Sequence, residues 1–128
     1  MAKEDIFRNI FRVEGFRYSF KIAAKGIVYL FLYHRNMRII FMLGLAALLT
    51  GFVFKLKGIE LVALCITVTL VFVAEIFNTA VELMMDAITE KYHTKIKLVK
   101  DVAAAVVLLT TLNAVAVCYI LFVRKIAG

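Results

Sequence analysis

The sequence predicts an all-α integral membrane protein, with three transmembrane helices preceded by an amphipathic surface helix. Of its 128 residues 64% are apolar, the mean hydropathy is +0.95, and proline is absent. Charged residues are concentrated in blocks between long apolar runs, which is typical of a multi-pass membrane protein and not of a soluble domain. The length fits a single membrane domain over residues 1–128.

The net charge of +7 follows from membrane topology and does not indicate nucleic-acid binding. Basic residues flank the apolar runs, and the sequence contains no surface array of basic and aromatic residues. The two cysteines, Cys65 and Cys118, lie inside apolar runs without a metal-ligating neighbour, so we expect free, packed thiols.

Residues 1–36 predict an amphipathic helix, either continuous or divided near Gly15. In its second part basic residues recur every four positions on one side, while apolar residues broadly occupy the other. The apolar run at 22–33 contains Lys25 and is too short to cross about 30 Å of hydrocarbon. We therefore expect this helix to lie in the headgroup layer. The alternative is a helix that packs on the rest of the protein.

Three apolar segments follow this helix and predict the membrane spans. The first, 39–54, is short but apolar throughout, and Lys55–Gly58 predicts a tight turn after it. The second helix, 60–90, begins as an apolar run and continues into a charged end. A polar connection at 91–97 leads to the third segment, 99–122.

The distribution of Lys and Arg predicts the orientation of the three spans. The N-terminal block has eight of these residues and the second connection has four, whereas the first connection and the C-terminus have two each. Because positive residues are retained on the cytoplasmic side, the N-terminus and the second connection are expected there.

Polar residues form a narrow stripe on the second predicted span: Glu75, Asn78, Glu82 and Asp86, at positions i, i+3, i+7 and i+11. The fourteen residues before Glu75 carry no charge, so the stripe continues a hydrophobic helix. Ionisable groups at membrane depth are costly and therefore indicate function. With the predicted orientation, Glu75 lies near the inner edge of the hydrocarbon and Asp86 about 16 Å further, in the cytosol.

The start of the third span adds cations to this boundary. Lys100 and Asp101 belong to an antiparallel neighbour of the second span, close to Lys95 and Lys97. Carboxylate oxygens suit Mg²⁺ and ammonium groups suit phosphate oxygens, so the combination favours a metal-bound phosphate. Small residues at 103–105 predict close helix packing that brings Asp101 toward the stripe. The residue types for phosphoryl transfer are present, without a glycine-rich phosphate loop.

These motifs resemble a known family. The resemblance is carried by Glu75-x-x-Asn78-Thr79-Ala80-x-Glu82-x-x-x-Asp86, Tyr92-His93 and Lys100-Asp101-x-Ala103-Ala104. This pattern resembles the signature of the prokaryotic diacylglycerol kinase family, whose Gram-positive branch phosphorylates undecaprenol. Gly26 and the segment 35–39 resemble the family's first segment, and the similarity covers the chain from about residue 16 onward.

The resemblance implies a homotrimer of three-span protomers in the bacterial inner (cytoplasmic) membrane, with active sites shared between neighbours at the cytoplasmic face. It implies a lipid kinase that transfers the γ-phosphate of ATP directly to the primary hydroxyl of undecaprenol or diacylglycerol, with Mg²⁺ and without a phosphoenzyme. By position, Glu75 would be the general base and Glu82 would hold Mg²⁺. The implied nucleotide contacts are Asn78, Asp86, Tyr92, His93, Lys100, Asp101 and His34, and the implied lipid contacts are Arg38 and Ala104.

One departure from the family pattern leaves alternatives open. His34 stands where the family usually has a Glu that shares metal binding with the equivalent of Glu82, and imidazole is a poor Mg²⁺ ligand. Ala105 also replaces a glycine common in the Gram-positive branch. A degenerate member or a non-catalytic scaffold is therefore an alternative. A small proton-coupled transporter with Glu75 as proton carrier is another, although it would not need the acids that extend toward Lys100.

Overall fold

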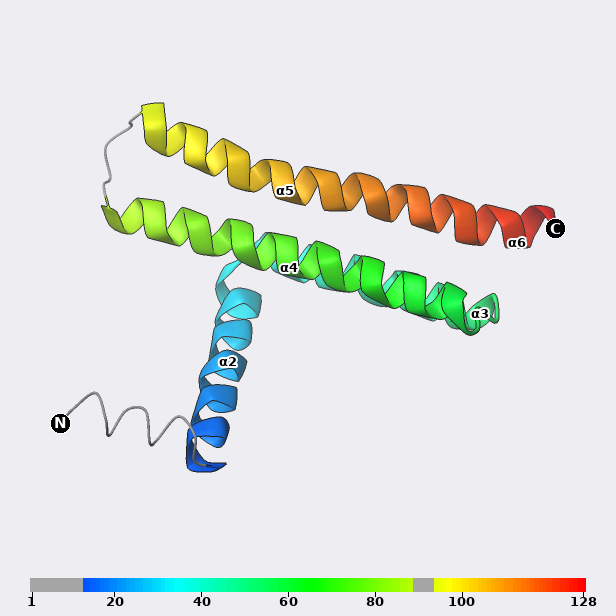
Figure 1. Cartoon of the computed structure of the whole chain (residues 1–128), viewed down its shortest axis with the longest axis horizontal. Coiled ribbons are helices and arrows are strands. Elements are labelled where there is room, and N and C mark those ends of the chain that lie inside the picture. The colour runs from blue at the N-terminus through cyan, green and yellow to red at the C-terminus, as the bar shows by residue number, and fades with distance from the viewer. Residues whose placement is uncertain (1–12, 89–93) are drawn as a thin grey trace. The chain divides into compact units, whose positions relative to one another are not determined.

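The computed structural model describes residues 13–88 and 94–128, and the part it describes is helical apart from short turns (Figure 1). The helices are α2 (Val13–Tyr33), α3 (Arg35–Val53), α4 (Ile59–Ile88) and α5 (Thr94–Cys118). A π-helical segment, Tyr119–Val123, continues α5 directly into α6 (Arg124–Ala127). The all-α prediction is confirmed. Residues 1–35 and 36–128 form two compact units, and each is described by itself.

Three helices are long and apolar enough to cross a membrane, which confirms the predicted spans: Arg35–Val53, Ile59–Ile88 and Thr94–Ala127. The second of these, α4, has 30 residues. At 1.5 Å per residue it is about 45 Å long, which exceeds a hydrocarbon core of about 30 Å. Its C-terminal turns, which carry the acidic residues, therefore have length to extend beyond the membrane.

The first unit contains α2, which begins at Val13 and passes through Gly15 without a break. The helix ends at Tyr33, and the His34 N–H still bonds the Leu30 carbonyl over 3.0 Å. The ring of Tyr29 lies 5.7 Å from the His34 ring, between centroids. The location of α2 in the headgroup layer and the single domain over 1–128 stay predictions.

The turn predicted after the first span is confirmed. The Leu56 N–H donates to the Gly51 carbonyl over 3.0 Å, and the Lys55 N–H to the Phe52 carbonyl over 3.1 Å. These two bonds form a Schellman motif, in which the residue after the C-cap adopts a left-handed backbone. That residue is Lys55, with φ 58°, where glycine is usual. Gly58, with φ 60°, is the last residue of the turn, and α4 begins at the next residue.

Two glycines of α3 leave room for side chains of α4. A Cβ atom on Gly44 would lie 2.9 Å from the Val68 Cγ1 atom, and one on Gly51 would lie 2.8 Å from the Leu64 Cδ2 atom. Leu64 is fully buried, so it has little freedom to move away. Small residues support packing in this way where lipid supplies no hydrophobic driving force between helices.

Helices α4 and α5 run side by side in opposite directions (Figure 1). One ion pair joins α4 to α5, with the Lys100 Nζ atom 2.8 Å from Asp86 Oδ1, and a second joins α4 to α6, with the Lys125 Nζ atom 3.6 Å from Glu60 Oε2. Between these two pairs Ala103 is the buried residue of α5. The two ion pairs mark the register in which α4 lies beside the α5–α6 segment.

Candidate functional site

The polar stripe of α4 changes from buried to exposed along the helix. The side chain of Glu75 is buried, with 6% of its surface exposed, and Asn78 is half-buried. Glu82 and Asp86, nearer the C-terminal end, are exposed. Along the axis, Asn78, Glu82 and Asp86 lie about 5, 10 and 16 Å from Glu75. The helix therefore connects one enclosed carboxylate with two that are open to ligands.

Asn78 carries a buried acceptor without a partner. Its Oδ1 atom is enclosed, and no described residue donates a hydrogen bond to it. Buried polar atoms are nearly always paired, because an unpaired one costs about 1–3 kcal/mol. A donor from a bound molecule, from another copy of the chain or from residues outside the described part would satisfy this oxygen.

Lys100 holds the exposed end of the stripe to α5. Its ammonium group donates to Asp86 and also interacts electrostatically with Glu82. A single cation therefore lies beside both exposed carboxylates of the stripe. Such a group is suited to meet phosphate oxygens once a nucleotide brings its own negative charge.

Asp101 does not turn toward the stripe. Its Oδ2 atom accepts a hydrogen bond of 2.8 Å from Lys97, four residues earlier on the same helix. The close packing expected from the small residues is made by Ala103, which is buried, while Ala104 and Ala105 are exposed. The ammonium group of Lys97 neutralises the Asp101 carboxylate, whereas the acids of the stripe would repel it.

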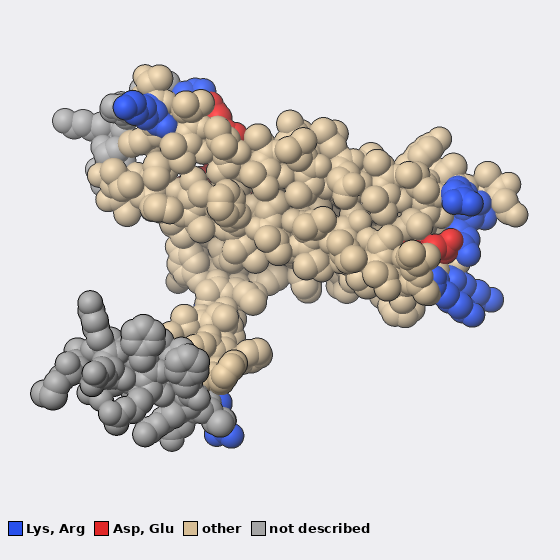
Figure 2. All heavy atoms as spheres, viewed as in Figure 1, with Lys and Arg blue, Asp and Glu red and all other residues tan. Residues whose placement is uncertain are grey.

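The charged side chains of the bundle formed by α3, α4 and α5 gather at its two ends, with uncharged surface between them (Figure 2). One end carries the Asp86–Lys100 pair. The other carries Glu60, Lys125 and the basic residues of the α3–α4 turn. The uncharged middle fits a membrane-spanning body, and the candidate site lies at the end that carries the polar stripe and the Asp86–Lys100 pair.

The exposed carboxylates fit a magnesium–nucleotide site. Glu82 and Asp86 are four residues apart on α4, which places them on one face about 6 Å apart. In the described residues no group of three or more ligating side chains could hold a metal ion. Mg²⁺ commonly binds one or two carboxylates together with substrate phosphates, so two ligands are compatible with it.

The remaining predicted contacts are distributed over both units. Tyr92 and His93 lie outside the described residues. His34 is half-buried at the junction between α2 and α3 and belongs to the first unit. Arg38 on α3 and Ala104 on α5 are both exposed, in the second unit.

Thr79 had no predicted role, yet it is buried beside Glu75. Its side chain is 3% exposed and stands four residues after Glu75, on the same face of α4. A periodicity analysis would have found it, because buried polar residues one turn apart on an apolar helix indicate a shared polar environment.

Comparison with known proteins gives consistent matches. The family model for prokaryotic diacylglycerol kinase matches residues 21–122. A diacylglycerol kinase from Synechocystis sp. is 35% identical over 118 residues, which cover 91% of this chain and 67% of the relative. An undecaprenol kinase from Bacillus subtilis is 31% identical over 108 residues, which cover 84% of this chain and 88% of the relative.

Proposed function

The chain belongs to the prokaryotic diacylglycerol kinase family, and from this membership we propose that it transfers the γ-phosphate of ATP to the primary hydroxyl of a membrane lipid alcohol at the cytoplasmic face. The protein is a multi-pass member of a lipid kinase family. The observation that carries the proposal is the stripe of α4, which leads from the buried Glu75 to the exposed Asp86–Lys100 pair.

The order of residues along α4 supports one arrangement of the substrates. The lipid hydroxyl would meet Glu75 at the membrane end of the stripe. The triphosphate would extend along the stripe past Asn78 toward Lys100, with its γ-phosphate next to the lipid hydroxyl. The buried Oδ1 atom of Asn78 would accept a hydrogen bond from a donor in this assembly, which would remove the cost of leaving it unpaired.

In the proposed reaction Glu75 acts as the general base. Its carboxylate takes the proton of the lipid hydroxyl while that oxygen attacks the γ-phosphorus in line with the bond to the β-phosphate oxygen. The new P–O bond forms as the old one breaks, ADP leaves, and Glu75 later returns the proton to solvent. Lys100 would balance the negative charge of the phosphates, and no phosphoenzyme forms.

Glu82 and Asp86 are the residues that would hold Mg²⁺ with the nucleotide. The ion, when bound, would neutralise phosphate charge and orient the triphosphate. Glu82 carries most of this proposal, because Asp86 is already bonded to Lys100. The half-buried His34 replaces a carboxylate that the family resemblance expects as a further ligand, which would weaken the site.

The acceptor is proposed to be undecaprenol or diacylglycerol, since the two relatives are named for these lipids. Purified protein with ATP and Mg²⁺ should be tested on both lipids, with labelled phosphate followed into extracted lipid. We expect one lipid to be labelled far faster than the other. Glu75→Gln protein prepared in parallel should show no labelling. Proton-driven flux without any labelled lipid would contradict the kinase proposal and favour a transporter.

We also propose that the protein is a homotrimer whose active sites are shared between protomers. Within the described residues one chain brings no group of three metal-ligating side chains together, so a neighbouring copy could complete the site. Mixing two variants on different helices, Glu75→Gln on α4 and Arg38→Ala on α3, tests this if each is inactive alone. A site that combines α4 of one protomer with α3 of its neighbour predicts recovery of part of the activity in mixed trimers, whereas a site within one chain predicts none.

A further inference from the structure

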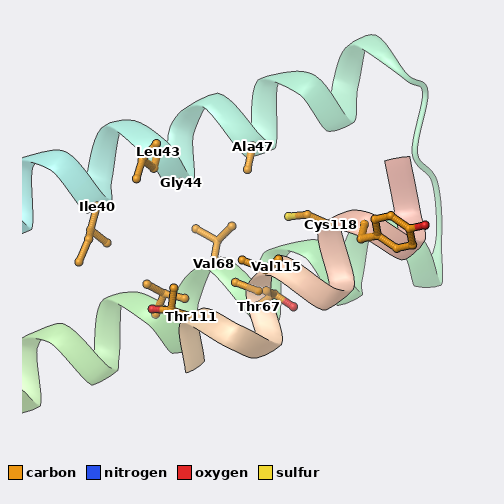
Figure 3. A pocket seen from close by; sticks show the side chains of 12 residues that line it. Ile40, Leu43, Gly44, Ala47, Thr67, Val68, Thr111, Val115 and Cys118 are labelled. Atoms are coloured by element: carbon orange, nitrogen blue, oxygen red, sulfur yellow. The ribbon is translucent and has the colours of Figure 1, made fainter. Parts of the chain in front are cut away.

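An apolar groove of about 600 Å³ lies between α3, α4 and α5 in the middle of the second unit (Figure 3). Its volume is within the range of about 300–1,000 Å³ that is typical of ligand sites. Ile40 and Ala47 contribute from α3, Val71 from α4, and Ala114 and Cys118 from α5. Side chains from three helices therefore point into one space.

The walls of this groove suit hydrocarbon. Among the described residues that line it none is charged. The hydroxyl of Thr67, which also lines it, donates to the Ala63 carbonyl over 2.7 Å and so has its hydrogen bond within the helix. A polar ligand would find few partners there, whereas an alkyl or isoprenoid chain needs none.

One end of the groove lies at the level of Glu75. Thr111 lines the groove and follows Lys100 by eleven residues, while Glu75 precedes Asp86 by eleven. Because Lys100 and Asp86 are bonded and the helices are antiparallel, Thr111 and Glu75 stand at the same height. Val71, also in the lining, is one helical turn from Glu75 on the same face.

From the level of Glu75 the groove runs away from the end that carries the Asp86–Lys100 pair. Its far end lies at Thr67 of α4, about 12 Å from Glu75 along the axis, and at Tyr119, directly after α5. Tyr119 begins the π-helical segment between α5 and α6. Such segments are uncommon and frequently occur at functional sites. The groove is therefore an apolar path that starts beside the buried carboxylate and leads deeper into the span.

We propose that this groove holds the hydrocarbon chain of the lipid alcohol whose hydroxyl meets Glu75, and thereby selects acceptors by chain length. The proposal rests on the proposed kinase function. A lipid with its hydroxyl at Glu75 must extend its chain away from the acids, and the groove is the apolar space in that direction. The chain leaves an equally apolar bilayer, so the groove acts by positioning and not through a hydrophobic driving force.

A matched pair of substitutions on α5 tests the proposal. Ala114→Phe fills the groove, whereas Ala116→Phe adds the same ring at an exposed position outside it. The measurement is the ratio of kcat/KM for a long-chain acceptor to that for a short-chain alcohol with the same headgroup. We expect Ala114→Phe to lower this ratio about fivefold and Ala116→Phe to leave it unchanged. An unchanged ratio in Ala114→Phe, or an equal fall in both variants, would overturn the proposal.

A second measurement does not depend on catalysis. A lipid alcohol with a photoreactive diazirine in the middle of its chain is irradiated with the intact protein, and adducts are mapped by mass spectrometry. We expect adducts near Cys118 and their loss in Ala114→Phe. Adducts concentrated at the exposed Cys65, which does not line the groove, would contradict the proposal. If the wild-type protein labels no lipid with phosphate, the kinase function fails while this experiment still decides the groove.

A second copy of the chain is the competing occupant. In that case Ala114→Phe would alter the oligomeric state and reduce turnover of long and short acceptors alike, and groove residues would not be cross-linked to the lipid. That set of results would also overturn the proposal.

Discussion

Lys100 of α5 donates a hydrogen bond of 2.8 Å to Asp86 of α4, so the cation of one helix is held at the end of the other helix's acidic stripe. Both side chains are partly exposed, 37% for Lys100 and 66% for Asp86. Exposed ion pairs stabilise proteins by about 0–1 kcal/mol. The contact therefore contributes little to folding, while it places an ammonium group where the proposed triphosphate lies.

Replacing Lys100 should separate function from stability. Lys100→Met should lower kcat/KM for ATP about 100-fold, the cost of removing one charged donor from a phosphoryl-transfer site. The apparent Tm in detergent should hardly change, because the ion pair is exposed. Steady-state kinetics at varied ATP and thermal unfolding measure the two effects.

Lys125→Met is the matched control, since Lys125 of α6 pairs with Glu60 at the opposite end of α4. It should keep both ATP kinetics and Tm near wild type. A large fall in Tm with retained activity in Lys100→Met would assign this residue a structural role.

His34 offers a test of the metal site. If it stands in place of a carboxylate ligand, His34→Glu should lower the Mg²⁺ concentration for half-maximal activity by about three- to tenfold, because another hard oxygen ligand strengthens binding. Titration of activity with Mg²⁺ at saturating ATP measures the change. His34→Gln, of similar size but without charge, should leave the requirement as it is. An unchanged or higher requirement in His34→Glu would count against a ligand position.

The three spans and the turn at Lys55–Gly58 could be predicted because hydropathy and local turn chemistry are properties of neighbouring residues. The helical period placed the four stripe residues on one face of α4, and their order along the axis predicted that Glu75 is buried and Asp86 exposed. What could not be predicted depends on contacts between helices, and the unpaired oxygen of Asn78 is one case. The pairing of Asp101 with Lys97 is different, because it joins residues four apart on α5, a spacing that the sequence does show.

The apolar groove could not be predicted from the sequence either, because its walls come from three different helices whose packing a single sequence does not reveal. The Schellman motif after α3 was hidden for a different reason. Its left-handed position holds Lys55, whereas the sequence signal for that motif is glycine.

Two glycines in different environments should respond oppositely to a larger side chain. Gly51→Val should lower stability by about 1–3 kcal/mol, since a Cβ atom there would lie 2.8 Å from the fully buried Leu64. Gly26→Ala should be neutral or stabilising by up to about 1 kcal/mol, because nothing lies within 4 Å and alanine favours helix. Thermal unfolding of both variants in the same detergent checks the prediction. Equal Tm values for Gly51→Val and wild type would contradict the packing of Leu64 against Gly51.

The general base is tested most directly by Glu75→Gln, which keeps the size of a buried side chain and removes its negative charge and its ability to take a proton. Loss of a general base typically costs about 10²- to 10⁴-fold, so phosphoryl transfer should fall to near background. Binding of ATP and the apparent Tm should be retained, because the amide can still form hydrogen bonds at this site. Glu60→Gln, at the other end of α4, is the control and should remain active. Turnover above about one tenth of wild type in Glu75→Gln would exclude Glu75 as the base.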